Sequence, residues 1–275
     1  MRDYKELKVA TRKIRESIVT MIHSANSGHP GGSLSAVEIL AALYFEEMNI
    51  DPKNPKKDDR DRFVLSKGHA APVLYATLAE KGYFDKSELT SLRKINSMLQ
   101  GHPDMKGIPG VEMSTGSLGQ GFSVACGMAM ASKLDDAPWR VYALLGDGEV
   151  QEGIVWEAAM SAAHYKLDNL VAFLDYNGLQ IDGETEKVMN INPIVDKFKA
   201  FGWNVVEIDG HDFDQIFAVL DVAKETVGKP TMVIAKTIKG KGVSFMEHAA
   251  GWHGTAPSDD DVRKALEEIG GADNE

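Results

Sequence analysis

The sequence predicts an α/β protein of three layers, in which a mainly parallel β-sheet is covered by helices on both faces. Residues 141–145 and 170–174 are continuous apolar runs, which is typical of strands buried on both faces. A helical segment at 151–165 lies between them. Asp147 and Asn177, which follow the two runs, are thirty positions apart, and this spacing suits a strand, a crossover helix and a parallel strand.

The first part of the chain is expected to be helical. Apolar side chains recur at helical spacing over residues 4–25 and predict a long amphipathic helix. A glycine-rich loop follows at 28–32. A second helix is expected over 35–46, with Ser33 or Ser35 as its N-cap.

A short strand is expected at 62–66, followed by a turn at 67–69 and a helix over 70–80. Residues 100–118 contain several glycines and prolines and are interpreted as a loop. The next helix, which continues to Lys133, is rich in alanine, serine and glycine. Small residues there indicate the close approach of a neighbouring element or a ligand.

Strands and helices alternate in the remainder of the chain. Strand candidates at 203–208 and 231–235 enclose a helix near 213–226. Because the sequence shows no linker and no internal repeat, one domain over residues 1–275 is expected.

Composition limits the classes of partner. The 275 residues carry a net charge of −11, which argues against nucleic acid or an anionic membrane as partner but does not exclude a phosphorylated ligand. Cys126 has no second cysteine to pair with, as expected in a reducing cytosol, and its small-residue surroundings favour helix packing over a reactive thiol. Without a signal-peptide core or an apolar run near the ~20 residues of a membrane span, a cytoplasmic protein is expected.

Asp147 and Asn177 are the first candidate site residues. Both should emerge at the carboxyl edge of the sheet, where ligands of open α/β folds bind. A carboxylate, an amide oxygen and a nearby main-chain carbonyl suit Mg²⁺ or Ca²⁺. Gly146 and Gly148 would let the backbone approach a phosphate closely. The alternative of two unrelated turn residues on adjacent loops stays open at this point.

Longer motifs add a family resemblance. GDGEVQEGIVWEA and LDYN resemble the thiamine-diphosphate motif, so the expected fold is a thiamine-diphosphate-binding fold. Further segments narrow the resemblance to the transketolases and occur in the expected order: SANSGHPGG, LSKGHA, GHPD, PGVEMSTGSLGQG, KTIKGKGVSF and WHG.

The resemblance implies a set of cofactor ligands. Asp147, Asn177 and the carbonyl of Leu179 would bind the divalent metal, Mg²⁺ or Ca²⁺, that anchors the diphosphate of thiamine diphosphate. Gly148 would offer a backbone N–H to the diphosphate. Lys239 matches a lysine that lies near the cofactor phosphates in the family, and a solvated side chain is an equally good interpretation for it. The other residues expected to bind the cofactor are His69, Gly116, Leu118, Gly146 and Glu149.

Histidines form the catalytic set that the resemblance implies. His29 and His253 would flank the reacting carbon and move protons, while His102 would contact an oxygen of the donor sugar. By contrast, His164 is assigned to the helix after the metal motif, and His211 to a surface turn.

Two glutamates on the expected crossover helix have weaker assignments. The resemblance places Glu152 at the subunit interface. Glu157 would support the metal loop or the same interface, and a solvated helix face is an equally good interpretation for it. Trp156, on the same helix, is compatible with a place in the core.

The resemblance also implies a partner. Transketolases have further domains, and this chain stops after KALEEIGGADNE, so it is expected to be an N-terminal subunit; a truncated chain would look the same. Its partner would carry the pyrimidine-binding domain and the activating glutamate, in a heterotetramer that is inactive without it. The reaction would transfer a two-carbon ketol unit between sugar phosphates, as in the pentose phosphate pathway. The alternatives are a subunit of another thiamine-diphosphate enzyme and a non-catalytic cofactor-binding or regulatory protein.

Overall fold

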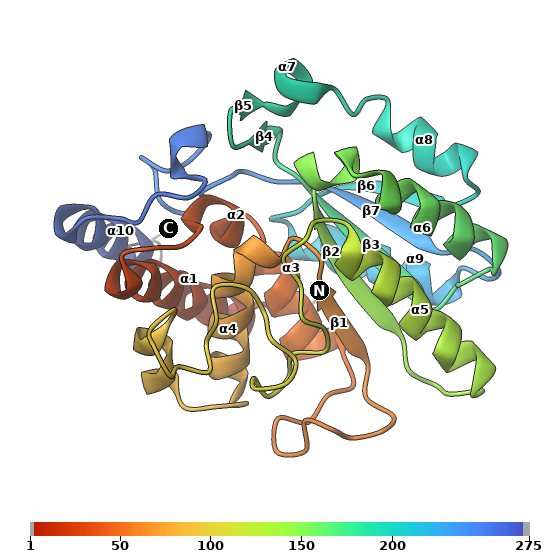
Figure 1. Cartoon of the computed structure of the whole chain (residues 1–275), viewed down its shortest axis with the longest axis horizontal. Coiled ribbons are helices and arrows are strands. Elements are labelled where there is room, and N and C mark those ends of the chain that lie inside the picture. The colour runs from red at the N-terminus through yellow and green to blue at the C-terminus, as the bar shows by residue number, and fades with distance from the viewer. Residues whose placement is uncertain (1–2, 272–275) are drawn as a thin grey trace.

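A parallel sheet of five strands forms the centre of the computed structural model, which describes residues 3–271 (Figure 1). The strand order is β1-β2-β3-β7-β6, and each neighbouring pair is parallel. The predicted parallel sheet is therefore confirmed. The strands are β1 (Arg62–Leu65), β2 (Val141–Gly146), β3 (Leu170–Tyr176), β6 (Asn204–Asp209) and β7 (Thr231–Lys236).

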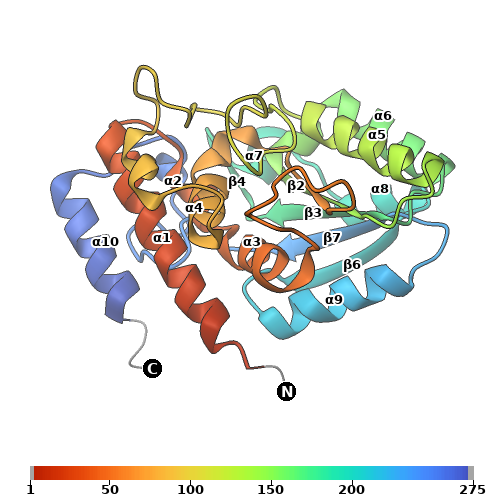
Figure 2. The same ribbon diagram turned by 90° about the horizontal axis from the view of Figure 1, so that it is seen from below.

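Helices cover both faces of this sheet, and the predicted three-layer arrangement is confirmed. In Figure 2, α5, α6 and α8 lie on one side of the strands, while α3 and α9 lie on the other. A two-stranded hairpin, β4 (Leu179–Gln180) and β5 (Gly183–Glu184), follows β3. The helices are α1 (Lys5–Ala25), α2 (Pro30–Leu34), α3 (Val37–Ala42), α4 (Ala71–Lys81), α5 (Gln120–Leu134), α6 (Gly153–His164), α7 (Thr185–Met189), α8 (Ile194–Ala200), α9 (Phe213–Glu225) and α10 (Asp259–Gly271).

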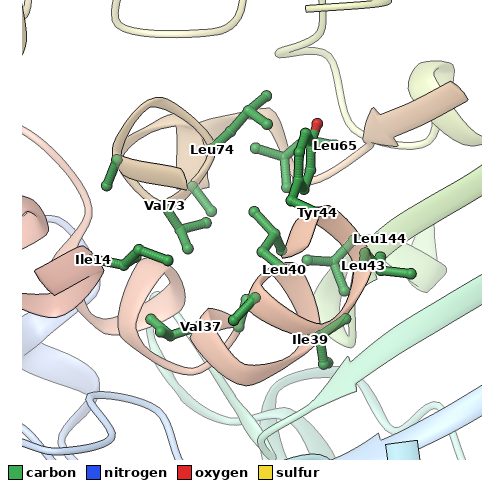
Figure 3. Close-up of a cluster of buried hydrophobic side chains, with 14 of the residues drawn as sticks. Ile14, Val37, Ile39, Leu40, Leu43, Tyr44, Leu65, Val73, Leu74 and Leu144 are labelled. Atoms are coloured by element: carbon green, nitrogen blue, oxygen red, sulfur yellow. The ribbon is translucent and has the colours of Figure 1, made fainter. Parts of the chain in front are cut away.

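Successive side chains of each strand enter two separate cores, because they point to opposite faces of the sheet. Leu144 of β2 belongs to the core formed with α1, α3, α4 and α9. Its neighbours Ala143 and Leu145 belong to the core formed with α5, α6 and α8. Figure 3 shows part of the first core, where Ile14 and Leu40 lie among side chains of α4, β1 and β2. This double burial is the physical reason that the strands read as unbroken apolar runs.

Register brings the carboxyl ends of three strands to one edge. Gly146 of β2 pairs with Asp175 of β3, and Asp175 in turn pairs with Ala235 of β7. The chain segments after β2, β3 and β7 therefore start side by side. These segments carry the GDG, LDYN and KTIKGKG motifs.

The N-terminal helices differ from the prediction. The segment expected to be a glycine-rich loop forms the short helix α2, whose Pro30 is well suited to the first helical position. The helix expected over 35–46 corresponds to α3 and to the π-helix Leu43–Glu47 that continues it. Neither Ser33 nor Ser35 caps it; the Ser35 hydroxyl donates to Asp175 instead (2.6 Å). The helices α7, α8 and α10 were not predicted. Residues 1–2 and 272–275 of the expected domain lie outside the described residues.

Two further expectations concern Cys126 and the membrane. Cys126 is buried, its Sγ lies 3.8 Å from the carbonyl oxygen of Ala158, and burial raises its pKa to about 12. The prediction of a packed, unreactive thiol agrees with this environment. Within residues 3–271, no helix has both the length and the apolar character needed to cross a bilayer.

Candidate active site

A cavity of about 370 Å³ opens at the carboxyl edge of the sheet. It gathers twelve of the thirteen site residues expected from the sequence; the exception is His102. The twelve residues are His29, His69, Gly116, Leu118, Gly146, Asp147, Gly148, Glu149, Asn177, Leu179, Lys239 and His253. Segments far apart in the chain therefore meet in one place.

Asp147 connects the first two of these segments. It follows β2 at the start of a 3-10 turn, where Oδ1 accepts a hydrogen bond from the amide of Gly148 (2.7 Å). Its Oδ2 accepts from the amide of Gly178, beyond β3 (2.6 Å). Burial and the charge of Asp175 raise the pKa of Asp147 to about 6, so the carboxyl group is mostly ionised at pH 7.

Asn177 and Leu179 line the same cavity as the Asp147 carboxylate. The amide of Asn177 donates through Nδ2 to Asp175 (3.2 Å), and its Oδ1 accepts from the amide of Leu179 (3.1 Å). One carboxylate, one amide oxygen and one main-chain carbonyl fit a small dication that keeps water or phosphate ligands.

Beneath these loops lies a buried ion pair that the sequence reasoning missed. Lys67 and Asp175, which are 1% and 0% exposed, form a salt bridge, and Lys67 also donates to the carbonyl of Gly32 (2.7 Å). Burial would raise the pKa of Asp175, but the charge of Lys67 and the hydrogen bonds from Lys67, Ser35 and Thr237 together outweigh burial and lower it. Lys67 lies in the motif LSKGHA, and Asp175 lies in the motif LDYN. A charged residue in an otherwise apolar strand was the signal that could have identified them.

Glu149 lines the cavity and also ties together the segments around it. Its buried carboxylate accepts hydrogen bonds from the hydroxyl of Ser66 and from the amides of Gly119 (2.8 Å) and Gly146 (2.9 Å). Burial raises its pKa. The geometry thus gives Glu149 a structural role, while its predicted contact with a diphosphate stays a prediction.

Three histidines form a cluster on the other side of the cavity. The ring centroids of His29, His69 and His253 are 5.2–5.4 Å apart. Burial, followed by the charges of Arg93 near His29 and Lys239 near His253, lowers both pKa values to about 4. Burial and Lys67 also lower the pKa of His69. At pH 7 these imidazoles are neutral, so each can donate one hydrogen bond and accept another.

His102 is exposed and stands just outside the residues that line the cavity. A Cβ placed on Gly116 would lie 3.2 Å from the His102 ring, so the imidazole packs against the backbone of a lining residue. Burial and the charge of Arg93 lower its pKa. The structure therefore puts His102 at the edge of the site.

Lys239 is buried, so its interpretation as a solvated side chain is wrong. Its ammonium donates to the carbonyl of Leu179 (3.1 Å) and lies 3.0 Å from Nδ1 of His253. Burial lowers its pKa to about 8, which leaves the group mostly protonated at pH 7. Lys239 thus joins the expected metal ligands to the histidine cluster.

The remaining polar assignments have mixed outcomes. His211 does sit in a turn, but its side chain is only 13% exposed and contacts Glu38, so the surface assignment is wrong. Glu152 and Glu157 are exposed on the crossover segment, and Glu152 lines the cavity. Trp156 is partly buried against one core.

Comparison with known proteins identifies a family. The family model described as "Transketolase, thiamine diphosphate binding domain" matches residues 7–275. A protein of Clostridium sp. (strain MSTE9), named 6-deoxy-6-sulfo-D-fructose transketolase subunit SqwG, is 48% identical over 96% of both chains. One of the subunits of the apulose-4-phosphate transketolase of Phocaeicola vulgatus is 44% identical, over 96% of this chain and 93% of its own.

Longer proteins match through one part of their length. Human transketolase is 44% identical over 96% of this chain, which spans 42% of the human protein. The crystal structure of transketolase from Campylobacter jejuni superposes with a TM-score of 0.92 at 36% identity, over 98% of this chain and 43% of that one. From the cavity geometry and these similarities, the chain belongs to the transketolase family and comprises its N-terminal thiamine diphosphate binding domain.

Proposed function

We propose that this chain is the cofactor-binding subunit of a two-subunit transketolase and binds thiamine diphosphate through a divalent metal, Mg²⁺ or Ca²⁺. One observation carries the proposal: Asp147, Asn177, Leu179 and Lys239 line one cavity at the sheet edge together with three histidines. Relatives of the same length are named as transketolase subunits, which favours a separate partner.

The metal end of the site follows from the donor set. Asp147 is the anionic ligand, and the Asn177 amide oxygen and the Leu179 carbonyl complete the protein's share of the coordination. The ammonium of Lys239 would then offset the negative charge of the diphosphate, and the backbone amide of Gly148 would donate a hydrogen bond to one of its oxygens. His69 would contribute a neutral hydrogen bond to the same group.

When bound, the cofactor would supply the nucleophilic carbon needed for transfer of a two-carbon ketol unit. The chain's own residues hold and move protons around it. His29 and His253 are neutral and adjacent, so they can exchange protons with sugar oxygens near pH 7. His102, at the rim, would bind a hydroxyl or carbonyl oxygen of the donor.

The other half of the site would belong to the partner. That second chain would carry the pyrimidine-binding domain and the glutamate that activates the cofactor, in a heterotetramer in the cytoplasm. Glu152 is exposed at the rim of the cavity, a position that suits contact with the partner. The donor would be a ketose with an anionic end group, either the phosphate or the sulfonate found in the names of relatives.

Metal-dependent binding can be tested with a matched pair of asparagines. The Oδ1 atoms of Asn177 and Asn190 each accept a hydrogen bond from the backbone amide two residues later in the chain, at N···O distances of 3.1 and 2.8 Å. Unlike Asn177, Asn190 is exposed and does not line the cavity. Calorimetric titration with thiamine diphosphate should give Mg²⁺-dependent binding that chelator abolishes. We expect Asn177→Ala to weaken binding at least tenfold and Asn190→Ala to leave it unchanged; equal effects would contradict the metal site.

A ketol-transfer assay distinguishes the remaining candidate functions of the chain. This chain by itself, the pyrimidine-domain partner by itself and their mixture are assayed for ketol transfer from a ketose phosphate and from a ketose sulfonate. We expect activity in the mixture only. Turnover by this chain without the partner would refute the two-subunit proposal, whereas tight assembly without turnover would favour a non-catalytic, regulatory role. Activity with a 2-oxo acid in place of a ketose would assign a different thiamine-diphosphate enzyme.

A further inference from the structure

The loop after β7 carries Lys239 into the cavity, yet two of its anchors lie outside the cavity. On one side of Lys239, the amide of Ile238 donates to Nε2 of His211 (2.9 Å). On the other side, the carbonyl of Lys241 accepts from Nε of Arg15 (3.0 Å). Neither His211 nor Arg15 lines the cavity.

Glu38 joins these two anchors. Its Oε1 accepts from Arg15 (2.6 Å), and its Oε2 lies 2.9 Å from Nδ1 of His211. All three side chains are at most 13% exposed. Burial would raise the pKa of Glu38, but Arg15 and the contact with His211 outweigh it and lower the pKa to about 2. A buried anion therefore connects both sides of the Lys239 loop.

The hydrogen-bond directions fix one state of His211. A backbone N–H can only donate, so Nε2 of His211 must accept from Ile238. The proton of the neutral ring then sits on Nδ1, from which it is donated to Glu38. A single neutral tautomer satisfies both partners, as in sites where a carboxylate orients a functional histidine.

The sequence of this loop explains why such anchors matter. Gly240 and Gly242 have φ values of 83° and 91°, a region that favours glycine. Glycines give a loop many conformations when it is unsupported, so holding Lys239 in place has an entropic cost. Fixed backbone atoms at Ile238 and Lys241 restrict those conformations from both sides.

We propose that His211, Glu38 and Arg15 form a positioning network that fixes the Lys239 loop and thereby holds the ammonium of Lys239 in the cavity. The network acts through the backbone and does not contact the ligand. The proposal rests on the proposed function for the identity of that ligand, a metal-bound diphosphate. The placement of the loop itself does not depend on it.

Two replacements of His211 separate its two hydrogen bonds. In His211→Gln the amide oxygen occupies the approximate place of Nε2 and can accept from Ile238. In His211→Asn the shorter amide can donate to Glu38 but does not reach Ile238. Exposed His164 supplies a control, His164→Asn, remote from the loop.

Hydrogen–deuterium exchange of the peptide covering residues 237–243 is measured on the full chain, together with calorimetric affinity for thiamine diphosphate in Mg²⁺. We expect His211→Asn to exchange at least tenfold faster in this peptide and to bind about tenfold more weakly, as for the loss of a partner that orients a ligand. His211→Gln and His164→Asn should stay within about threefold of the wild type.

Equal exchange and affinity in His211→Gln and His211→Asn would overturn the proposal, because a purely structural role does not distinguish the two amides. If His211→Asn fails to fold, Arg15→Lys provides the test, since lysine can pair with Glu38 but cannot also reach the carbonyl of Lys241. Unchanged exchange in Arg15→Lys would then overturn the proposal. A mixture of the wild-type chain with its pyrimidine-domain partner that binds no cofactor would refute the proposed function, while exchange would still decide the network.

Discussion

Replacing Lys67 by methionine tests the buried ion pair beneath the cavity. Methionine has a similar length and volume but no charge, so Lys67→Met leaves the carboxylate of Asp175 buried without its cation. Hydrogen bonds from Ser35 (2.6 Å) and Asn177 (3.2 Å) and one from Thr237 remain. These donors offset part of the cost of the unpaired charge.

The expected magnitude follows from this arrangement. Breaking a buried pair by removing one partner typically costs about 3–5 kcal/mol, and we take about 3 kcal/mol because three donors remain. For a chain of this size, each kcal/mol lowers Tm by roughly 2–4 °C. Circular-dichroism melting of Lys67→Met should therefore show Tm lowered by about 6–12 °C.

The matched control is Lys187→Met. Lys187 pairs with Glu184, and the two side chains are 75% and 57% exposed, so the loss should be below about 1 kcal/mol. The double variant Lys67→Met/Asp175→Asn removes both charges and should regain part of the lost stability. Similar Tm shifts for Lys67→Met and Lys187→Met, or a double variant as unstable as the sum of its single variants, would refute the reasoning.

Three further predictions concern other parts of the fold. Because folding lowers the pKa of Glu38 from 4.5 to about 2, the ionised carboxylate stabilises the fold fully above pH 4.5, and this stabilisation is lost towards pH 2. Urea denaturation at pH 7 should show that Glu38→Gln is about 3 kcal/mol less stable than the wild type, and this difference in stability should narrow below pH 4.5. Gly119→Ala should cost about 1–3 kcal/mol in the same assay, since φ is +80° and the new Cβ would meet Ile154 at 2.5 Å, whereas Gly251→Ala should be nearly neutral because nothing lies within 4 Å. Cys126, with a pKa near 12, should react with a thiol reagent only after denaturant is added, and fast labelling of the native chain would contradict its burial.

Local patterns predicted the sheet well and some helices poorly. The central strands β2, β3 and β7 are apolar along nearly their whole length because they are buried on both faces. The edge strands β1 and β6 were predicted from shorter apolar stretches. The helix α10 was missed because only Ala265 and Ile269 are buried among its charged residues. Its position depends on packing against α1, which a local pattern does not contain.

The residues of the candidate site also fall into those that local sequence patterns could predict and those that they could not. Asp147 and Asn177 could be placed because each follows a strand, and parallel strands end at a common edge. The partners of Lys67 and His211 could not be placed, because Asp175 and Glu38 are 108 and 173 positions away in the chain. His211 lies in a segment whose sequence is typical of a surface turn, but tertiary packing buries its side chain. Which polar groups pair in the interior is decided by packing between layers.

The charges of the cavity explain why a dication is central to the proposed function. Among the described residues that line it, five carry a carboxyl group (Asp147, Glu149, Glu152, Asp175 and Asp182) and two carry an ammonium (Lys67 and Lys239). The three lining histidines have lowered pKa values and add no positive charge at pH 7. Lys67 is already paired with Asp175, so the protein alone would repel a diphosphate. A dication held by Asp147, Asn177 and Leu179 would offset two of these negative charges beside the diphosphate, so cofactor binding would depend on the oxygen ligands more than on the neutral histidines.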